Sequence, residues 1–483
     1  MFWYVTMLIL YLVVMLYIGY YFRKTAGKSE DSYLVADRKI GSLVGGAAFA
    51  SNYTSTSGFL GSIGFAYATG IAAFSWVNIS LGIGGILSLL LVAPFLRRSG
   101  LTTFPDFFDK RYGKEIKAIS AIITVIIMYI YIIAQLKGGA LVAQYIFNLP
   151  YWVGVLVVAG VFIIYVASGG MYAATWTGVI QFVMMLAAMV TVFIAIIARF
   201  GGWTEMVNQV QSLKPLFFDM WGVTGTVFNL SFAFVMCLGI MSMPHVLIRF
   251  YAAKDANTAR NTVAIGTSLN MLFFFCTALV ATGAIVWFPK LKDPDFAYIM
   301  ITGELIYPLF AGLFFAAIWA AAMSTTDAQL IVAGSAISHD LYPILRKKLK
   351  KDLPSEASLV KISRIIMVIV GAASALTALK PPGLIVYIMA LAMILLISSF
   401  FIPLIMGIWW KRATRTGALF SMLGGFLSAI ILHPATPIFK IKPPFLVGVY
   451  GVLISFVLMV VVSYMTQPPG RDTEDFIEKM HKA

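Results

Sequence analysis

The stretch LFAGLFFAAIWAAAMSTTDAQLIVAGSAIS, residues 309–338, decides the fold class of this chain. It is long and apolar enough to cross a bilayer as one helix, yet the run Ser-Thr-Thr-Asp stands at 324–327, near its middle. An ionisable group at that depth is costly, so Asp327 indicates a functional site by default. Because hydroxyl, carboxylate and carbonyl oxygens are ligands of hard cations, the stretch predicts a small-cation site inside a membrane helix.

The composition extends this interpretation to the whole chain. Apolar residues make up 60% of the 483 residues and charged residues 11%, proportions that exclude a soluble protein of this size. The apolar residues come in repeated stretches of about 20 residues, the length that crosses a bilayer. We therefore expect one all-α, multi-pass domain of the cell membrane, with short loops and a short tail.

Positive charge gathers on one side of the expected membrane. The net charge is +15, which by itself would also fit a nucleic-acid partner. Lys and Arg cluster between alternate pairs of spans, at 23–39, 97–117, 249–260, 346–364, 411–415 and 471–482. This asymmetry marks the cytoplasmic side of the membrane. It favours a lipid bilayer as the partner and argues against nucleic acid.

We expect thirteen spans, at about 1–22, 41–70, 72–96, 117–148, 151–168, 174–200, 224–246, 262–288, 309–338, 362–379, 383–409, 416–433 and 444–466. The N-terminus then lies outside and the C-terminus inside. The expected division is a first helix and loop, a first repeat, an external segment, a second repeat, two extra helices and a tail: 1–40, 41–200, 201–223, 224–410, 411–466 and 467–483. A second external segment, 289–306, is either a short helix or a plain connector.

Two spans carry breaks. The second, GGAAFASNYTSTSGFLGSIGFAYATG, is dominated by small and polar residues, and the seventh, FNLSFAFVMCLGIMSMPH, contains Gly239 and Pro244. Backbone groups freed at that depth must line a cavity or be buried in protein. The two spans open consecutive sets of five, and an odd number of spans inverts one set relative to the other. Paired interrupted helices in inverted halves indicate the central site of a transporter.

A monovalent cation could lie between the second and ninth spans. An unwound stretch over 53–56 would expose carbonyl oxygens, while Ser324 and Thr325 add hydroxyls and Ala321 a carbonyl. The same small residues could instead serve close helix packing. Asp327 lies on another flank of its helix at 100° per residue. It could be a proton site, a group that supports the ion ligands from behind, or a structural acceptor for a buried donor such as Lys137.

Four motifs resemble the sodium:solute symporter family over about residues 30–410: AAMSTTDAQLIVAGSAISHDLY, SNYTSTSGFLGSIGFAYATGI, SGGMYAATWTGVIQF and MPHVLIRFYAAKDANTAR. The resemblance implies a thirteen-helix protein with a five-plus-five inverted-repeat core of the LeuT type. It also implies a sodium site, carried over by position onto Tyr53, Thr56, Ala321, Ser324 and Thr325.

The chain departs from the family pattern at several positions. Ser55 and Gly178 stand where many members have Asp, and Ala321 stands where members with a second sodium place a hydroxyl. These departures favour one sodium ion per solute. They also leave proton coupling through Asp327 as an alternative.

The resemblance places the solute beside the two broken spans, near Asn52, Ser55, Ser57, Gln135, Met236, Ile240 and Pro244. The motif MPHVLIRFYAAKDANTAR is closer to the branch for monocarboxylates such as acetate, lactate, pyruvate or pantothenate. A carboxylate can bind the exposed N–H groups and positive end of a half-helix. We therefore expect sodium-coupled import of a small organic anion, with an amino acid, notably proline, as the alternative.

Other functional classes have weaker support. An enzyme would need a catalytic constellation, and the sequence offers no His or Cys pair and no carboxylate dyad inside a span. A channel would pass ions without saturable, gradient-coupled solute uptake, and it stays the less favoured alternative.

Overall fold

The secondary-structure elements that the structure describes are all helical, which confirms the predicted class. The computed structural model describes residues 2–26, 28–381, 383–434, 439 and 441–482, with the backbone alone at 26 and 164–169. The first half forms α1 (Phe2–Ala26), α2 (Glu30–Val35), η1 (Ala36–Arg38), α3 (Ser42–Tyr53), η2 (Ser57–Gly61), α4 (Ser62–Thr69), α5 (Ala72–Leu91), α6 (Ala93–Ser99), α7 (Phe104–Tyr112), α8 (Lys114–Phe147), α9 (Tyr151–Phe200), α10 (Trp203–Leu213) and α11 (Gly225–Ser242). The second half forms α12 (Pro244–Ala252), α13 (Ala256–Trp287), η3 (Pro294–Phe296), α14 (Ala297–Leu305), α15 (Pro308–Ser335), η4 (Ala336–Leu341), α16 (Tyr342–Lys348), α17 (Glu356–Ala378), α18 (Ile385–Leu396), η5 (Ile397–Phe401), α19 (Ile402–Trp409), α20 (Arg415–Leu432), α21 (Pro444–Met465) and α22 (Arg471–His481).

Eleven helical segments of the described chain are long and apolar enough to cross a membrane. Two of the expected spans are not among them, for separate physical reasons. The segment Tyr151–Ile163 is apolar but shorter, and α9 turns at Gly170, whose φ of 56° and ψ of −158° end the helical path. The second expected span is divided into α3, η2 and α4, so no single piece has the required length.

Both interrupted spans break where the sequence predicts. In the second span α3 ends at Tyr53, and Thr54 has the non-helical angles φ −75° and ψ 69°. In the seventh, Met243 adopts φ −71° and ψ 108° between α11 and α12. Pro244 begins α12, where its missing N–H costs no helical hydrogen bond.

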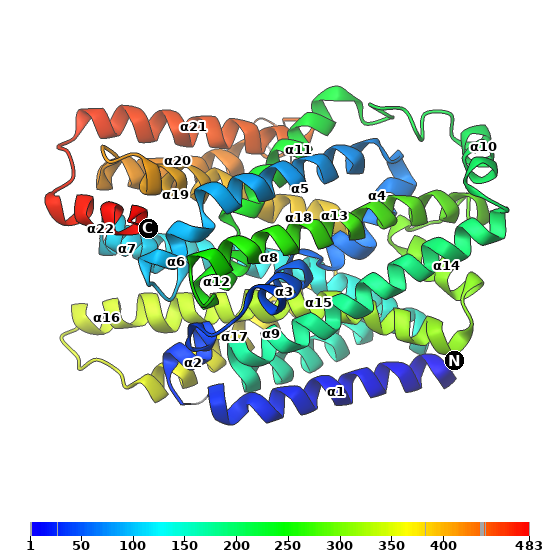
Figure 1. The fold of residues 1–483 in the computed structure, drawn as a ribbon, viewed down its shortest axis with the longest axis horizontal. Helices are drawn as coiled ribbons and strands as arrows, with labels where there is room; N and C mark the ends of the chain where they lie inside the picture. Colours follow the sequence, from blue (N-terminus) through cyan, green and yellow to red (C-terminus); the bar gives the residue numbers. More distant parts are fainter. Residues whose placement is uncertain (1, 27, 382, 435–438, 440, 483) are drawn as a thin grey trace.

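The helix that carries the Ser-Thr-Thr-Asp run lies in the interior. In the most apolar part of the span Pro308–Lys348, 83% of residues are buried inside the protein, against 22% for α1. Figure 1 shows α15 in the middle of the molecule, with α1 along one edge and α21 along the other. Neighbouring helices therefore surround α15, which lets it carry polar side chains that lipid would not tolerate.

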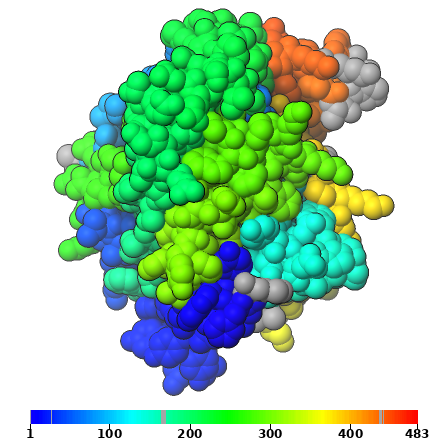
Figure 2. Space-filling view, turned by 90° about the vertical axis from the view of Figure 1, so that its right-hand side faces the viewer, coloured from blue at the N-terminus to red at the C-terminus, as the bar shows by residue number. Residues whose placement is uncertain are grey.

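The end of the molecule that carries the N-terminus is covered by short helices. Both of the longer segments that the sequence predicts to be external contain them: α10 lies in 201–223, and η3 with α14 lies in 289–306. Figure 2 shows this end, where the α14 region occupies the middle of the face beside the end of α8. The helical alternative for 289–306 is thus confirmed.

The opposite end holds a buried network of charged groups. Lys117 Nζ on α8 lies 2.6 Å from Asp106 Oδ1 on α7 and 3.2 Å from Asp340 Oδ1 on η4. His339 Nδ1 lies 2.8 Å from Glu30 Oε1 on α2. These contacts join four elements, α2, α7, α8 and η4, which come from three separate regions of the sequence. A second link pairs Ile40 with Ala253 in an isolated parallel bridge, which ties the chain before α3 to the end of α12.

Candidate functional site

The break after α3 leaves two carbonyl oxygens without their helical donors. In a continuous helix, Ser51 O and Asn52 O would accept from the N–H groups of residues 55 and 56. Ser55 N instead bonds Tyr53 O at 2.8 Å, and Thr56 N bonds Gln135 Oε1 at 2.9 Å. The two carbonyls are therefore available to another partner.

Two hydroxyls of α15 supply that partner. Ser324 Oγ donates to Ser51 O and Thr325 Oγ1 donates to Asn52 O, both at 3.0 Å. Ser324 Oγ also lies 3.2 Å from Ala321 O of its own helix. Hydroxyl and carbonyl oxygens from two helices thus converge in a dry, enclosed place. This is the donor set that a dehydrated monovalent cation requires.

The structure brings most of the predicted sodium ligands to this place. Ala321, Ser324 and Thr325 lie together on α15 against the end of α3. The carbonyls that the hydroxyls contact belong to Ser51 and Asn52, two residues and one residue before the predicted Tyr53. The exact carbonyls depend on where the freed N–H groups go, and the sequence does not contain that information.

Gln135 and Gly138 fix the broken segment against α8. Gln135 Oε1 accepts from both the backbone N and the Oγ1 of Thr56, at 2.9 and 2.8 Å. One turn along α8, a Cβ at Gly138 would lie 1.8 Å from Thr56 Cγ2. Only glycine allows this approach. The Gly-Gly pair at 138–139 was a signal of close packing that the sequence interpretation did not use.

A small central cavity of about 30 Å³ lies beside the break. Of the seven predicted solute residues, Ser55, Ser57 and Met236 line it. Ser55 Oγ lies 3.4 Å from the hydroxyl of Tyr131. The full lining is mainly aromatic and methionine side chains: Tyr53, Ser55, Ser57, Gly58, Ser62, Phe74, Val77, Tyr131, Phe232, Met236, Met243, Phe274, Val386, Met389 and Met393.

The other four predicted solute residues are buried outside this lining: Asn52, Gln135, Ile240 and Pro244. Asn52 Nδ2 donates to the carbonyl of His245 at 3.3 Å, and Arg249 Nη2 donates to Asn52 Oδ1 at 3.2 Å. Asn52 thereby joins α3 to α12.

Asp327 faces a different set of neighbours. It is buried on α15, close enough to Tyr11 of α1 for its charge to act on that hydroxyl. Gln181 of α9 also donates to the Tyr11 hydroxyl at 2.9 Å. The described contacts of Lys137 Nζ go to Asp295 Oδ2, at 2.7 Å, and to Gly383 O. These contacts do not support Lys137 as the donor to Asp327.

A group of metal-ligand type lies at the end of the molecule opposite the N-terminus. One ligand atom each of Asp106, His339 and Asp340 falls within 4.8 Å of the others. The ammonium group of Lys117, however, contacts both carboxylates, and a cation there would meet its charge at close range. This cluster is an ion-pair network, and the sequence missed it because its members come from separate segments.

The profile of the sodium:solute symporter family matches residues 33–425, most of the chain. The chain belongs to the sodium:solute symporter family. The osmoregulated proline transporter OpuE of Bacillus subtilis is 28% identical to this symporter, over 98% of this chain and 97% of its own. The sodium/proline symporter of Staphylococcus aureus strain RF122 is 29% identical, and sodium/proline symporter 2 of Staphylococcus saprophyticus is 30% identical, each over 98% of this chain and 95% of its own.

Solved structures show the same fold. A sodium-coupled sialic acid symporter superposes with a TM-score of 0.81 at 19% identity, over 97% of this chain and 99% of that one. The nucleobase-cation symporter Mhp1 gives a TM-score of 0.57 at 12% identity, over 92% of this chain and 98% of that one. The symporter is thus a multi-pass membrane transporter with a LeuT-like fold. It is not an enzyme, and sodium is its cotransported ion.

We predict that Gly138→Ala damages the site through Thr56. The added methyl group would overlap Thr56 Cγ2, and relieving the overlap should cost about 1–3 kcal/mol. The melting temperature and sodium-driven uptake should both fall.

The matched control is Gly160→Ala on α9, where a Cβ meets nothing within 4 Å. This variant should keep both properties, since alanine favours a helix over glycine. Equal behaviour of the two variants would show that the contact between α8 and the break is not needed.

Proposed function

We propose that the symporter imports a small amino acid, proline before other candidates, together with one sodium ion. The relatives named above support the amino-acid alternative over the small-carboxylate expectation, because proline is the solute that their names give. They align with this chain over nearly its full length. Family membership supports the sodium-coupled part of the proposal.

The lining of the central cavity suits a compact apolar ring once the cavity widens beyond its present volume of about 30 Å³. Phe232, Phe274 and Met236 contribute apolar surface to it, and Ser55 and Tyr131 contribute hydroxyls. The pyrrolidine ring of proline would pack on the apolar side chains. Its carboxylate would use the polar groups at the break, near the positive end of the η2–α4 half-helix. In this proposal Asn52, Gln135, Ile240 and Pro244 shape the site from behind its lining.

The observation that carries the sodium proposal is the pair of 3.0 Å contacts from Ser324 and Thr325 to the end of α3. We place the ion between these helices, with ligands from the predicted set: Tyr53, Thr56, Ala321, Ser324 and Thr325. Because the ligands come from two helices, ion occupancy would favour one relative position of those helices. The membrane potential adds about 2.3 kcal/mol per charge per 100 mV.

The topology that we propose has thirteen spans, with the N-terminus outside and the C-terminus inside. The eleven continuous spans, the short helix Tyr151–Ile163 and the broken α3–α4 segment support this number. The broken segments α3–η2–α4 and α11–α12 would open two inverted sets of five, over 41–200 and 224–410. The LeuT-like fold supports this division.

We predict that Ser324→Ala and Thr325→Ala each raise the sodium concentration for half-maximal uptake about tenfold, the equivalent of one lost ligand or hydrogen bond. The measurement is initial uptake in proteoliposomes over a sodium series.

Ser335→Ala on the same helix is the control, because Ser335 Oγ bonds only the nearby carbonyl of Val332, at 3.1 Å, among the described contacts. It should leave the sodium dependence unchanged. If both site variants also kept the parent sodium dependence, Ser324 and Thr325 would not be ligands.

Substrate choice is tested by melting-temperature shifts of the purified protein with proline, acetate, lactate or pyruvate, with and without sodium. Binding to the folded state raises stability, by about 2.7 kcal/mol at a hundred times Kd. Proline should give the largest shift, and only with sodium. A larger shift with lactate or acetate would restore the small-carboxylate assignment, and counterflow of the stabilising solute would identify transport.

We propose that Asp327 supports the site from behind the ion ligands and does not carry a proton. Its position toward α1, on another flank of α15 from Ser324, supports this role. Asp327→Asn should therefore lower the rate of uptake without changing the shape of its pH dependence. Loss of the pH dependence in this variant would instead assign Asp327 as the proton carrier.

A further inference from the structure

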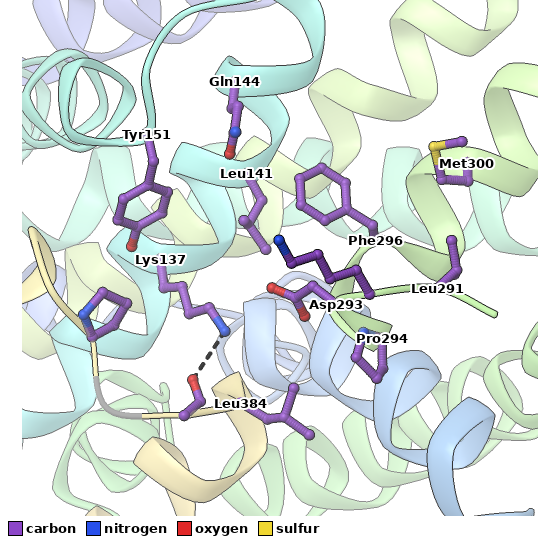
Figure 3. Close-up of a pocket in the computed structure, with 13 residues that line it drawn as sticks. Lys137, Leu141, Gln144, Tyr151, Leu291, Asp293, Pro294, Phe296, Met300 and Leu384 are labelled. Atoms are coloured by element: carbon purple, nitrogen blue, oxygen red, sulfur yellow. Dashed lines mark hydrogen bonds between the residues drawn. The ribbon is translucent and has the colours of Figure 1, made fainter.

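A large pocket opens at the end of the molecule that we propose to be external. Its volume is about 760 Å³, and it lies among the end of α8, the start of α9, the η3–α14 region and the segment before α18. Lys137 and Lys292 bring positive charge to its wall, and Asp293 brings a carboxylate. Tyr151 and Phe296 add aromatic surface (Figure 3). We name this space the outer pocket.

A buried ion pair forms the floor of the outer pocket. Lys137 Nζ lies 2.7 Å from Asp295 Oδ2, with side-chain exposures of 7% and 0%. The ammonium also donates to Gly383 O at 3.0 Å, and Ile385 N donates to Asp295 Oδ2 at 3.2 Å. Figure 3 shows Lys137 reaching from α8 to the chain just before Leu384. The pair thus joins α8, η3 and the start of α18.

This ion pair separates the outer pocket from the central cavity. Leu384 lines the outer pocket and Val386 lines the central cavity, while Ile385 between them donates to Asp295. On the other side, a Cβ at Gly64 of α4 would lie 2.9 Å from Asp295 Oδ1. Three consecutive residues therefore run from one cavity to the other through the pair. The ion pair therefore lies between the linings of the two cavities.

Lys137 has capacity for a second carboxylate. An ammonium group has three N–H donors. The two described bonds, to Asp295 and Gly383, use two of them. Because Lys137 also lines the outer pocket, a ligand there can reach this cation while Asp295 is still bound.

We propose that the outer pocket is a reception site for the carboxylate group of the solute, and that Lys137 exchanges Asp295 for that carboxylate when the external path opens. This inference rests on the proposed function only in requiring a solute that carries a carboxylate. Proline and the monocarboxylates both meet that requirement.

The exchange links solute arrival to opening. A buried charge that loses its partner is strongly destabilising. Once the solute carboxylate pairs with the Lys137 ammonium, the Asp295 carboxylate has lost its partner and is stabilised by moving toward water. Because Asp295 belongs to η3, its movement would carry the η3–α14 segment away from α4 and α18. The floor of the outer pocket would then open beneath the bound solute.

The barrier is tested by labelling a cysteine at Ser62, a residue that lines the central cavity. The chain's own two cysteines are replaced by C237A and C276A, and S62C is exposed to a membrane-impermeant thiol reagent applied from outside, without solute. Asp295→Asn should raise the labelling rate about tenfold, because a neutral amide holds Lys137 less strongly than a carboxylate does. Asp293→Asn in the same pocket is the matched control and should label at the parent rate. If the Asp295→Asn protein labels at the parent rate, the Lys137–Asp295 pair is not a barrier between the two cavities.

The reception role is tested by uptake kinetics. Lys137→Gln should raise the KM for proline about tenfold, the loss expected for one charge-assisted hydrogen bond, and leave the sodium dependence unchanged. The double variant Lys137→Gln/Asp295→Asn contains no unpaired buried charge at this position, which protects its folding. It should label as fast as Asp295→Asn and keep the high KM. A parent-like KM in the double variant would show that Lys137 serves only as the partner of Asp295.

Failure of this inference differs from failure of the proposed function. If the parent takes up lactate, acetate or pyruvate but not proline, the KM measurement moves to that solute, and only the choice of proline is wrong. Uptake of none of the four would overturn the proposed function and the reception site together. If the parent takes up proline normally, but Asp295→Asn labels at the parent rate and the double variant has a parent-like KM, only the inference is overturned.

Discussion

A helix that stops inside a membrane leaves carbonyl oxygens without donors, and this symporter is organised around that deficit. The break after Tyr53 frees the carbonyls of Ser51 and Asn52, and the hydroxyls of Ser324 and Thr325 satisfy them. Water is absent at this depth, so each such group must find a partner within the protein. A hydroxyl group can satisfy a carbonyl and also contact an ion. The oxygen atoms that stabilise the break would then also form the proposed ion site.

Much of this centre could be predicted from the sequence, because the signals are local. The run of small and polar residues at 51–57 and the Pro at 244 predict breaks in the helices. The Ser-Thr pair at 324–325 predicts oxygen ligands for a cation. The resemblance to the family supplied their pairing across the chain. The identity of the contacted carbonyls was beyond reach, since it follows from Gln135 capturing the N–H of Thr56.

The charged contacts at the two ends were not predicted, because they depend on contacts between distant segments. Lys137 and Asp295 are 158 positions apart, and Asp295 stands in the three-residue helix η3, where no local sequence signal marks it as buried. The network at the opposite end likewise joins Glu30, Lys117 and His339 from three regions of the chain. The sequence asymmetry in Lys and Arg predicts sidedness, but it does not distinguish a Lys or Arg in an exposed loop from one in a buried ion pair such as Lys117.

The link between α3 and α12 has a mechanical consequence. Asn52 contacts both Arg249 and the carbonyl of His245, and Ile40, just before α3, pairs with Ala253, just after α12. Contacts at both ends therefore hold these two half-helices against each other. Displacing one of them alone would require breaking these contacts, so the two half-helices are built to shift as a pair.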